Sequence, residues 1–125
     1  MAVRGIRGAI TVKNDTPNEI IEETTLLLKE MIEKNNVKTD EICSIFFTVT
    51  QDLKSEFPAV AARKLGLTNT PLLCMTEIPV EKALKKVIRI LIQFNTDLPQ
   101  KNIQHIYLKD AIKLRPDLNK KTNTT

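Results

Sequence analysis

Apolar and polar residues alternate along residues 2–12, and this period of two predicts a β-strand. Each face of the predicted strand carries every second residue. One face has Arg4, Ile6, Gly8, Ile10 and Val12, and the other has Val3, Gly5, Arg7, Ala9 and Thr11. The small neighbours of Arg7 leave space beside its long cationic side chain. The pattern fits either a glycine-weakened edge strand or a strand against which a ligand lies.

The apolar period changes to three and four residues after residue 16, which predicts an amphipathic helix that ends at about Asn35. Thr16 supplies a hydroxyl at the N-cap, Pro17 stands at the first helical position, and Glu19 stands at N3. This is the pattern of a capping box. The residues on the predicted core face are Ile20, Ile21, Thr24, Leu27, Leu28, Met31 and Ile32.

Runs of β-branched, aromatic or alternating apolar residues predict four further strands, at residues 42–50, 71–77, 86–94 and 103–108. A short helix is expected at residues 59–65, ending near Gly66, and a helical turn at 80–85. The order is therefore strand, helix, strand, helix and three strands. It predicts an α/β (α+β) fold, a mixed β-sheet with helices on one face and partner subunits on the other.

Composition indicates a single domain, residues 1–118, followed by a polar tail, residues 119–125, that we expect to be disordered. No stretch approaches the roughly 18–20 uninterrupted apolar residues of a membrane span. Arginines interrupt the N-terminal apolar run, so it does not resemble a signal peptide. Cys43 and Cys74 lie far apart and have no zinc-site spacing, so reduced thiols are expected. The sequence predicts a cytoplasmic protein.

The charge pattern excludes several function classes. The net charge is +4, the chain has no Trp, and its lysines are scattered, so nucleic-acid binding is unsupported. No glycine-rich phosphate loop is present, and the single histidine, His105, gives no His-rich metal site. As the lone imidazole, His105 fits a strand histidine better than a general base.

Arginine is scarce among the cations: 19 positions are Lys or Arg, and only five of them are Arg. Only Arg presents a rigid fork of donors that matches a carboxylate, so these five are candidates for ligand binding; the alternative is ordinary surface charge. Arg89 stands mid-strand between apolar residues, which favours a site or a subunit contact over a satisfied edge charge.

A small set of reactive or charged residues stands in or beside the predicted strands: Arg7, Cys74, Glu77, Arg89 and Tyr107. Cys74 has no nearby sequence cue for an activating base, so a buried thiol fits better than a nucleophile. The set has little capacity for proton transfer or covalent catalysis. It suits an anion-binding pocket that places fixed positive charge beside a developing negative charge.

Several motifs, in order and spacing, resemble the AroH-type (monofunctional) chorismate mutases over residues 2–118. They are VRGIRGA at 3–9, TxDL and FPA within 50–59, CMTE at 74–77, KKVIR at 85–89, TDLP at 96–99, HIYL at 105–108 and LRPDL at 114–118. The resemblance implies the fold of chorismate-mutase-like and YjgF-like protomers, assembled as a homotrimer with sites between subunits. It also implies rearrangement of chorismate to prephenate, on the route to phenylalanine and tyrosine, without a cofactor or metal.

The resemblance also implies residue roles. Arg89 would donate to the ether oxygen and reach a carboxylate, and Arg7, supported by Tyr107, would bind the side-chain carboxylate. Glu77 and Cys74 would engage the ring hydroxyl. The remaining implied substrate contacts are the apolar wall of Phe57, Ala59, Leu72 and Leu73, and Arg63, Leu114 and Arg115 near the mouth.

The chain departs from the family pattern in two places. Val60 stands where the family commonly has a lysine, and the stretch at 66–71 is shorter and lacks a common aromatic residue. In an ideal strand Cys74 and Glu77 would also face opposite sides, so both reach one ligand only if the strand twists or ends near 75–76. A non-catalytic trimeric binder of small carboxylates and a weak nucleic-acid module remain alternative functions.

Overall fold

The structure is a computed structural model that describes residues 1–115. A single five-stranded sheet forms its centre, in the strand order β3-β2-β4-β1-β5. The strands are β1 (Ala2–Thr11), β2 (Ile42–Val49), β3 (Leu72–Thr76), β4 (Val87–Thr96) and β5 (Ile106–Tyr107). The predicted tail at 119–125 and the end of the predicted domain lie outside the described residues.

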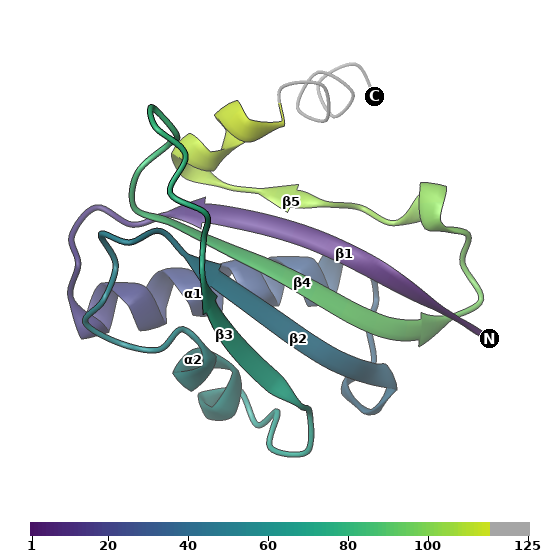
Figure 1. Ribbon diagram of the computed structural model, residues 1–125. Coiled ribbons are helices and arrows are strands. Elements are labelled where there is room, and N and C mark those ends of the chain that lie inside the picture. The colour runs from purple at the N-terminus through teal and green to yellow at the C-terminus, as the bar shows by residue number, and fades with distance from the viewer. Residues whose placement is uncertain (116–125) are drawn as a thin grey trace.

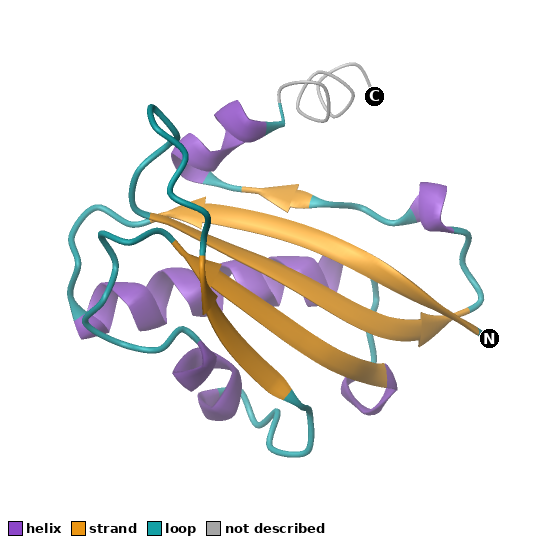
Figure 2. Cartoon of the chain, in the orientation of Figure 1, coloured by secondary structure: helices purple, strands orange, loops and turns teal. Residues whose placement is uncertain are grey.

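The sheet is mixed, as the sequence predicted. β4 pairs antiparallel with both β1 and β2, whereas β3 pairs parallel with β2 and β5 pairs parallel with β1. The two helices, α1 (Pro17–Lys34) and α2 (Ala59–Lys64), lie on the same face of the sheet (Figures 1 and 2). No α-helix covers the other face within residues 1–115, and we call it the open face. At one end of this face, the 3₁₀ helix Lys109–Leu114 packs Ala111 against Ala9 and Val87, which are buried there.

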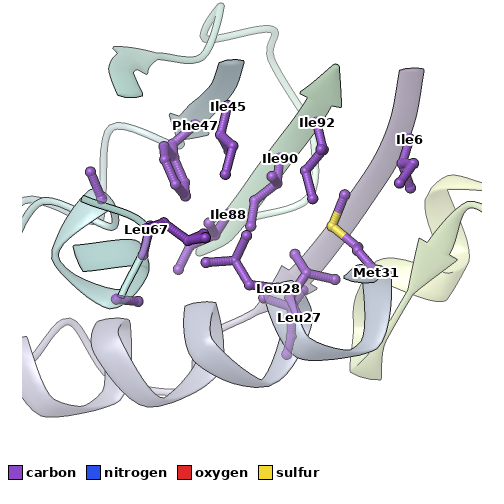
Figure 3. Packing of buried hydrophobic residues seen from close by; sticks show 14 of the residues in the cluster. Ile6, Leu27, Leu28, Met31, Ile45, Phe47, Leu67, Ile88, Ile90 and Ile92 are labelled. Carbon is purple, nitrogen blue, oxygen red and sulfur yellow. The ribbon is translucent and has the colours of Figure 1, made fainter. Parts of the chain in front are cut away.

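The hydrophobic core fills the space between the sheet and α1. Figure 3 shows Leu27 and Leu28 of α1 beneath Ile88 and Ile90 of β4, and all four side chains are buried. Gly8 of β1 allows close contact with this helix, because a Cβ atom there would lie 2.5 Å from the Met31 sulfur. The alternation seen in the sequence therefore separates a buried face from the open face.

The helix boundaries agree with their sequence signals. Thr16 caps α1 by accepting a hydrogen bond from the Glu19 amide at 3.2 Å. The reciprocal half of the predicted capping box differs, since the Glu19 carboxylate accepts from the amide of Asn14 at 3.1 Å. Helix α2 is followed by Gly66 with φ +92°, a left-handed conformation that glycine adopts readily.

Two predicted elements are shorter or absent. The segment predicted as a helical turn at 80–85 is a plain turn, closed by a 3.1 Å bond from the Ala83 amide to the Val80 carbonyl. The predicted strand at 103–108 pairs as a strand only at Ile106–Tyr107. The sequence did not predict the three 3₁₀ helices, at Thr39–Glu41, Gln100–Asn102 and Lys109–Leu114.

The last strand is short because side chains replace backbone along the outer edge of β1. The side-chain amide of Gln100 bonds both the amide and the carbonyl of Gly5, at 3.0 and 2.7 Å. The ring of His105 accepts from the amide of Arg7 at 2.9 Å. Backbone pairing begins only at Gly8, opposite Ile106. Side-chain donors and acceptors thus satisfy backbone groups of this edge that the sequence pattern had assigned to a longer strand.

Candidate active site

Two arginines of adjacent strands share the open face. In the antiparallel register of β1 and β4, Arg7 lies opposite Leu91 and Arg89 lies opposite Ala9, so the two cations are diagonal neighbours. Both line a cavity of about 420 Å³. Its wall also includes Phe46, Thr48, Met75, Leu91 and Tyr107. The cavity therefore combines two guanidinium groups with a mostly apolar wall.

A carboxylate fixes the position of Arg89. Strand β3 ends at Thr76, and the next residue, Glu77, forms an ion pair with Nε of Arg89. The Glu77 side chain is 17% exposed and that of Arg89 is 44% exposed. The amide of Glu77 donates to the carbonyl of Val49 at 2.8 Å, which holds this residue against the end of β2. The guanidinium is thus oriented by an anchored and largely shielded carboxylate.

Tyr107 and Arg115 lie at the β5 side of the same face. Tyr107 pairs with Ala9 in the parallel register of β1 and β5 and packs against a small cluster that includes Ala111 and Leu114. The guanidinium carbon of Arg115 lies 5.9 Å from the centre of the Tyr107 ring, within cation–π range. A third arginine therefore stands at the rim of the region that holds Arg7.

A hydrogen-bonded clamp ties the start of β4 to the end of β2. The Thr50 hydroxyl donates to the Asp52 carboxylate at 2.5 Å and accepts from the amide of Val87 at 3.0 Å. Asp52 also accepts from the amide of Lys86, at 3.0 Å. In the sequence, Thr50 and Asp52 were noted only as part of a motif that resembles the family, and no structural role was predicted for them. Their Thr-x-Asp spacing, typical of local side-chain to backbone bonding, could have indicated this role. The clamp closes the loop that separates Glu77 from Arg89.

The other predicted site residues form a second group around α2 and the edge strand β3. Phe57 is 67% exposed and Cys74 is half-buried, and both line a separate cavity of about 330 Å³. Ala59 is buried at the start of α2, and Arg63 is exposed on that helix. Met75 lines both cavities, so the two groups are neighbours along β3.

Cys74 and Glu77 do not meet within one chain. Cys74 lies opposite Phe47, a buried residue, and packs against the core on the helix-covered face. Glu77 instead reaches Arg89 on the open face, because β3 ends before it. The expected end of the strand at 75–76 is therefore observed, but it brings Glu77 to Arg89 rather than to Cys74.

The environment of Cys74 keeps its thiol protonated. Burial raises the pKa of the Cys74 thiol above 9.0, and the Ala59 amide and the Arg63 charge offset this only in part. A protonated thiol is a weak nucleophile but still a hydrogen-bond donor. The structure therefore favours a role in binding over covalent chemistry.

The two leucines of β3 point to different sides. Leu72 packs against the core, whereas Leu73 is 52% exposed. Val60, at the departure from the family pattern, is half-buried on α2.

Among residues 1–115, no group of three His, Cys, Asp or Glu side chains is arranged to hold a metal ion. No helix in this range has the length and apolar character needed to cross a membrane.

Comparisons with known proteins agree with one another. A model of the family described as "Chorismate mutase type I" matches residues 3–118. The protein named chorismate mutase AroH in Thermus thermophilus is 51% identical over 117 residues, covering 93% of this chain and 96% of that protein. The protein of the same name in Bacillus subtilis (strain 168) is 44% identical over 125 residues, covering 99% of this chain and 98% of that protein.

A solved structure gives the same result in three dimensions. A chorismate mutase from Clostridium thermocellum, 53% identical, matches the fold with a TM-score of 0.84. The match covers 86% of this chain and 96% of that chain.

Proposed function

The chain belongs to the chorismate mutase type I family, and on that premise we propose that it is an isomerase that rearranges chorismate to prephenate. The observation that carries the proposal is the Arg89–Glu77 ion pair beside Arg7 and Tyr107 on one open face. The substrate carries two carboxylates, and the face offers cations and an apolar wall. We expect the step to occur in the cytoplasm, where the two free thiols, Cys43 and Cys74, stay reduced.

The reaction suits residues that do not exchange protons. One C–O bond breaks while one C–C bond forms within a single molecule, so the enzyme must hold a compact conformer and stabilise charge on the ether oxygen. Arg89 supplies that charge, and Glu77 fixes its direction and accepts from the ring hydroxyl. Arg7, Tyr107 and Arg115 bind carboxylate oxygens at the rim. No cofactor is required.

We propose that the second group of residues completes the site from a neighbouring copy in a homotrimer. Cys74 and the apolar wall formed by Phe57 and Leu73 lie around β3, at the edge of the sheet. Strand β3 and the loop after it also expose Met75, Ile78 (78%) and Val80 (65%). An unpaired edge strand with exposed apolar residues favours association. The buried hydroxyl of Thr48, which has no hydrogen-bond partner within residues 1–115, gives the open face a further polar atom to satisfy.

Two measurements test the proposal. Purified protein incubated with chorismate should consume it, followed as loss of chorismate absorbance, with prephenate as the product. Sedimentation should give the mass of three chains. Stoichiometric binding of chorismate without turnover would show that the protein binds carboxylates but is not an enzyme. A fully active monomer would contradict the proposal that the site is completed by a neighbouring subunit.

A further inference from the structure

The outer edge of β1 is held by three different kinds of partner. At Gly5 the partner is the Gln100 side chain, at Arg7 it is the His105 ring, and at Ala9 it is the backbone of Leu108, whose amide donates to the Ala9 carbonyl at 2.9 Å. Of these three partners, only His105 holds a residue of the candidate active site, Arg7. It is also the only one of the three that can gain a proton between pH 5 and 8.

The bond between Arg7 and His105 fixes the chemical state of the ring. Nδ1 accepts from the Arg7 amide at 2.9 Å, so this nitrogen carries no proton and the neutral ring holds its proton on Nε2. Burial lowers the pKa of His105 below its ordinary value of 6.5, which favours the neutral form. The acceptor is therefore maintained at neutral pH.

On this edge the ring of His105 is the partner of the Arg7 amide, one residue before the backbone pairing of β1 with β5 begins at Gly8. Arg7 is exposed, so packing does not fix its side chain. The direction in which its Cα–Cβ bond enters the cavity depends on the orientation of its peptide plane. The pairing with β4 holds β1 from one edge, and the His105 bond holds the Arg7 amide from the other.

We propose that neutral His105 is a positioning residue for Arg7. Its Nδ1 atom takes the place of a strand carbonyl and holds β1 so that the Arg7 guanidinium reaches the carboxylate of the ligand. This inference rests on the proposed function, because it assigns His105 a role in binding the same substrate. His105 itself does not contact the reacting atoms.

The chain offers a matched control on the same edge. His105→Ala removes one side-chain bond at Arg7, whereas Gln100→Ala removes two such bonds at Gly5, where no site residue stands. His105→Asn is the rescue variant, because its Oδ1 atom can accept near the position of Nδ1. If the edge bonds only stabilise the sheet, Gln100→Ala should be the more harmful of the two alanine substitutions.

Steady-state kinetics with chorismate separates these possibilities. We expect His105→Ala to raise KM by about two- to tenfold, the range expected from one hydrogen bond, with a smaller change in kcat. His105→Asn should restore KM, and Gln100→Ala should leave KM unchanged while lowering Tm. An unchanged KM in His105→Ala, or an equal increase in Gln100→Ala, would overturn the proposal.

Amide hydrogen exchange measured by NMR gives a readout that needs no turnover. The Arg7 amide should exchange faster in His105→Ala than in the wild type, but not in His105→Asn or Gln100→Ala. If the wild type fails to consume chorismate, the proposed function falls, and this measurement still decides whether His105 holds Arg7. Unchanged exchange at Arg7 in His105→Ala would refute the inference even if the enzyme is active.

Discussion

The two faces of the sheet use the same strands for different purposes. On the helix-covered face, β4 places Ile88, Ile90 and Ile92, all buried against α1. On the open face, one residue further along at each step, it places Arg89 and Leu91 in a cavity. The period of two thus divides one strand into a closed core and a surface that combines charge with exposed apolar area. Stability depends mainly on the first face, and under the proposed function ligand binding and assembly depend on the second.

Substitution at neighbouring positions of β4 should separate these roles most clearly. Ile90→Ala, at a residue that is 2% exposed, should lower the free energy of unfolding by about 2–5 kcal/mol. Leu91→Ala should cost less and should act mainly by weakening subunit association, because Leu91 faces the open side. Urea unfolding at fixed protein concentration and sedimentation would measure the two effects. Equal losses of folding stability would contradict the division between faces.

Removing the Arg89 guanidinium from the open face should nearly abolish catalysis and leave the fold intact. Arg89→Ala should lower kcat by about a hundred- to thousand-fold, or roughly 2.7–4 kcal/mol of barrier, as expected for a lost donor at a developing oxyanion. Arg89→Lys should also be poor, because an ammonium group lacks the planar fork. Turnover of chorismate and thermal unfolding are the measurements.

The control for Arg89 is a guanidinium away from the cavity. Arg4 lies on β1 and donates through Nε to the carbonyl of Leu98 at 2.9 Å. Arg4→Ala should leave kcat unchanged. If a variant with a neutral residue at position 89 retained the full kcat, Arg89 would have no role in the mechanism.

Cys74 offers a smaller test, on the helix-covered side of β3. Cys74→Ser should lower kcat/KM by less than about tenfold, because a hydroxyl keeps a donor at the same place. The raised pKa of the thiol also predicts slow alkylation at neutral pH. An inactive Cys74→Ser enzyme together with an active Arg89→Lys enzyme would favour covalent catalysis instead.

The sequence predicted what depends on local pattern. The alternation in β1 and β4 and the cap at Thr16 are decided within a few residues, and the structure contains all three. The sequence did not predict pairings decided by distant residues. The Glu77–Arg89 contact depends on a loop closed by Thr50 and Asp52, which bond to Lys86 and Val87 more than 30 residues away.

The last strand shows the same limit in a different form. Residues 103–108 have strand-forming character. The backbone groups at the edge of a neighbouring strand, however, can form hydrogen bonds either with another backbone or with side chains. Here Gln100 and His105 satisfy the edge at Gly5 and Arg7. Period alone does not reveal such a substitution, because it does not distinguish a backbone acceptor from an imidazole nitrogen. The prediction of His105 as a strand residue was wrong, since it lies one residue before β5, and its contact with Arg7 required the structure.

The smallest effect concerns the pH dependence of stability at this edge. Burial lowers the pKa of His105 in the folded chain below 6.5, so on acidification through 6.5 the unfolded chain takes up a proton that the folded chain resists. Stability contributed by neutral His105 is therefore complete above pH 6.5 and is lost progressively below it. His105→Asn cannot titrate, so the Tm of the wild type minus that of this variant should fall between pH 7.5 and pH 5.5. The subtraction cancels the carboxylates that both proteins share, and a constant difference would show that the ring gains its proton equally well in both states.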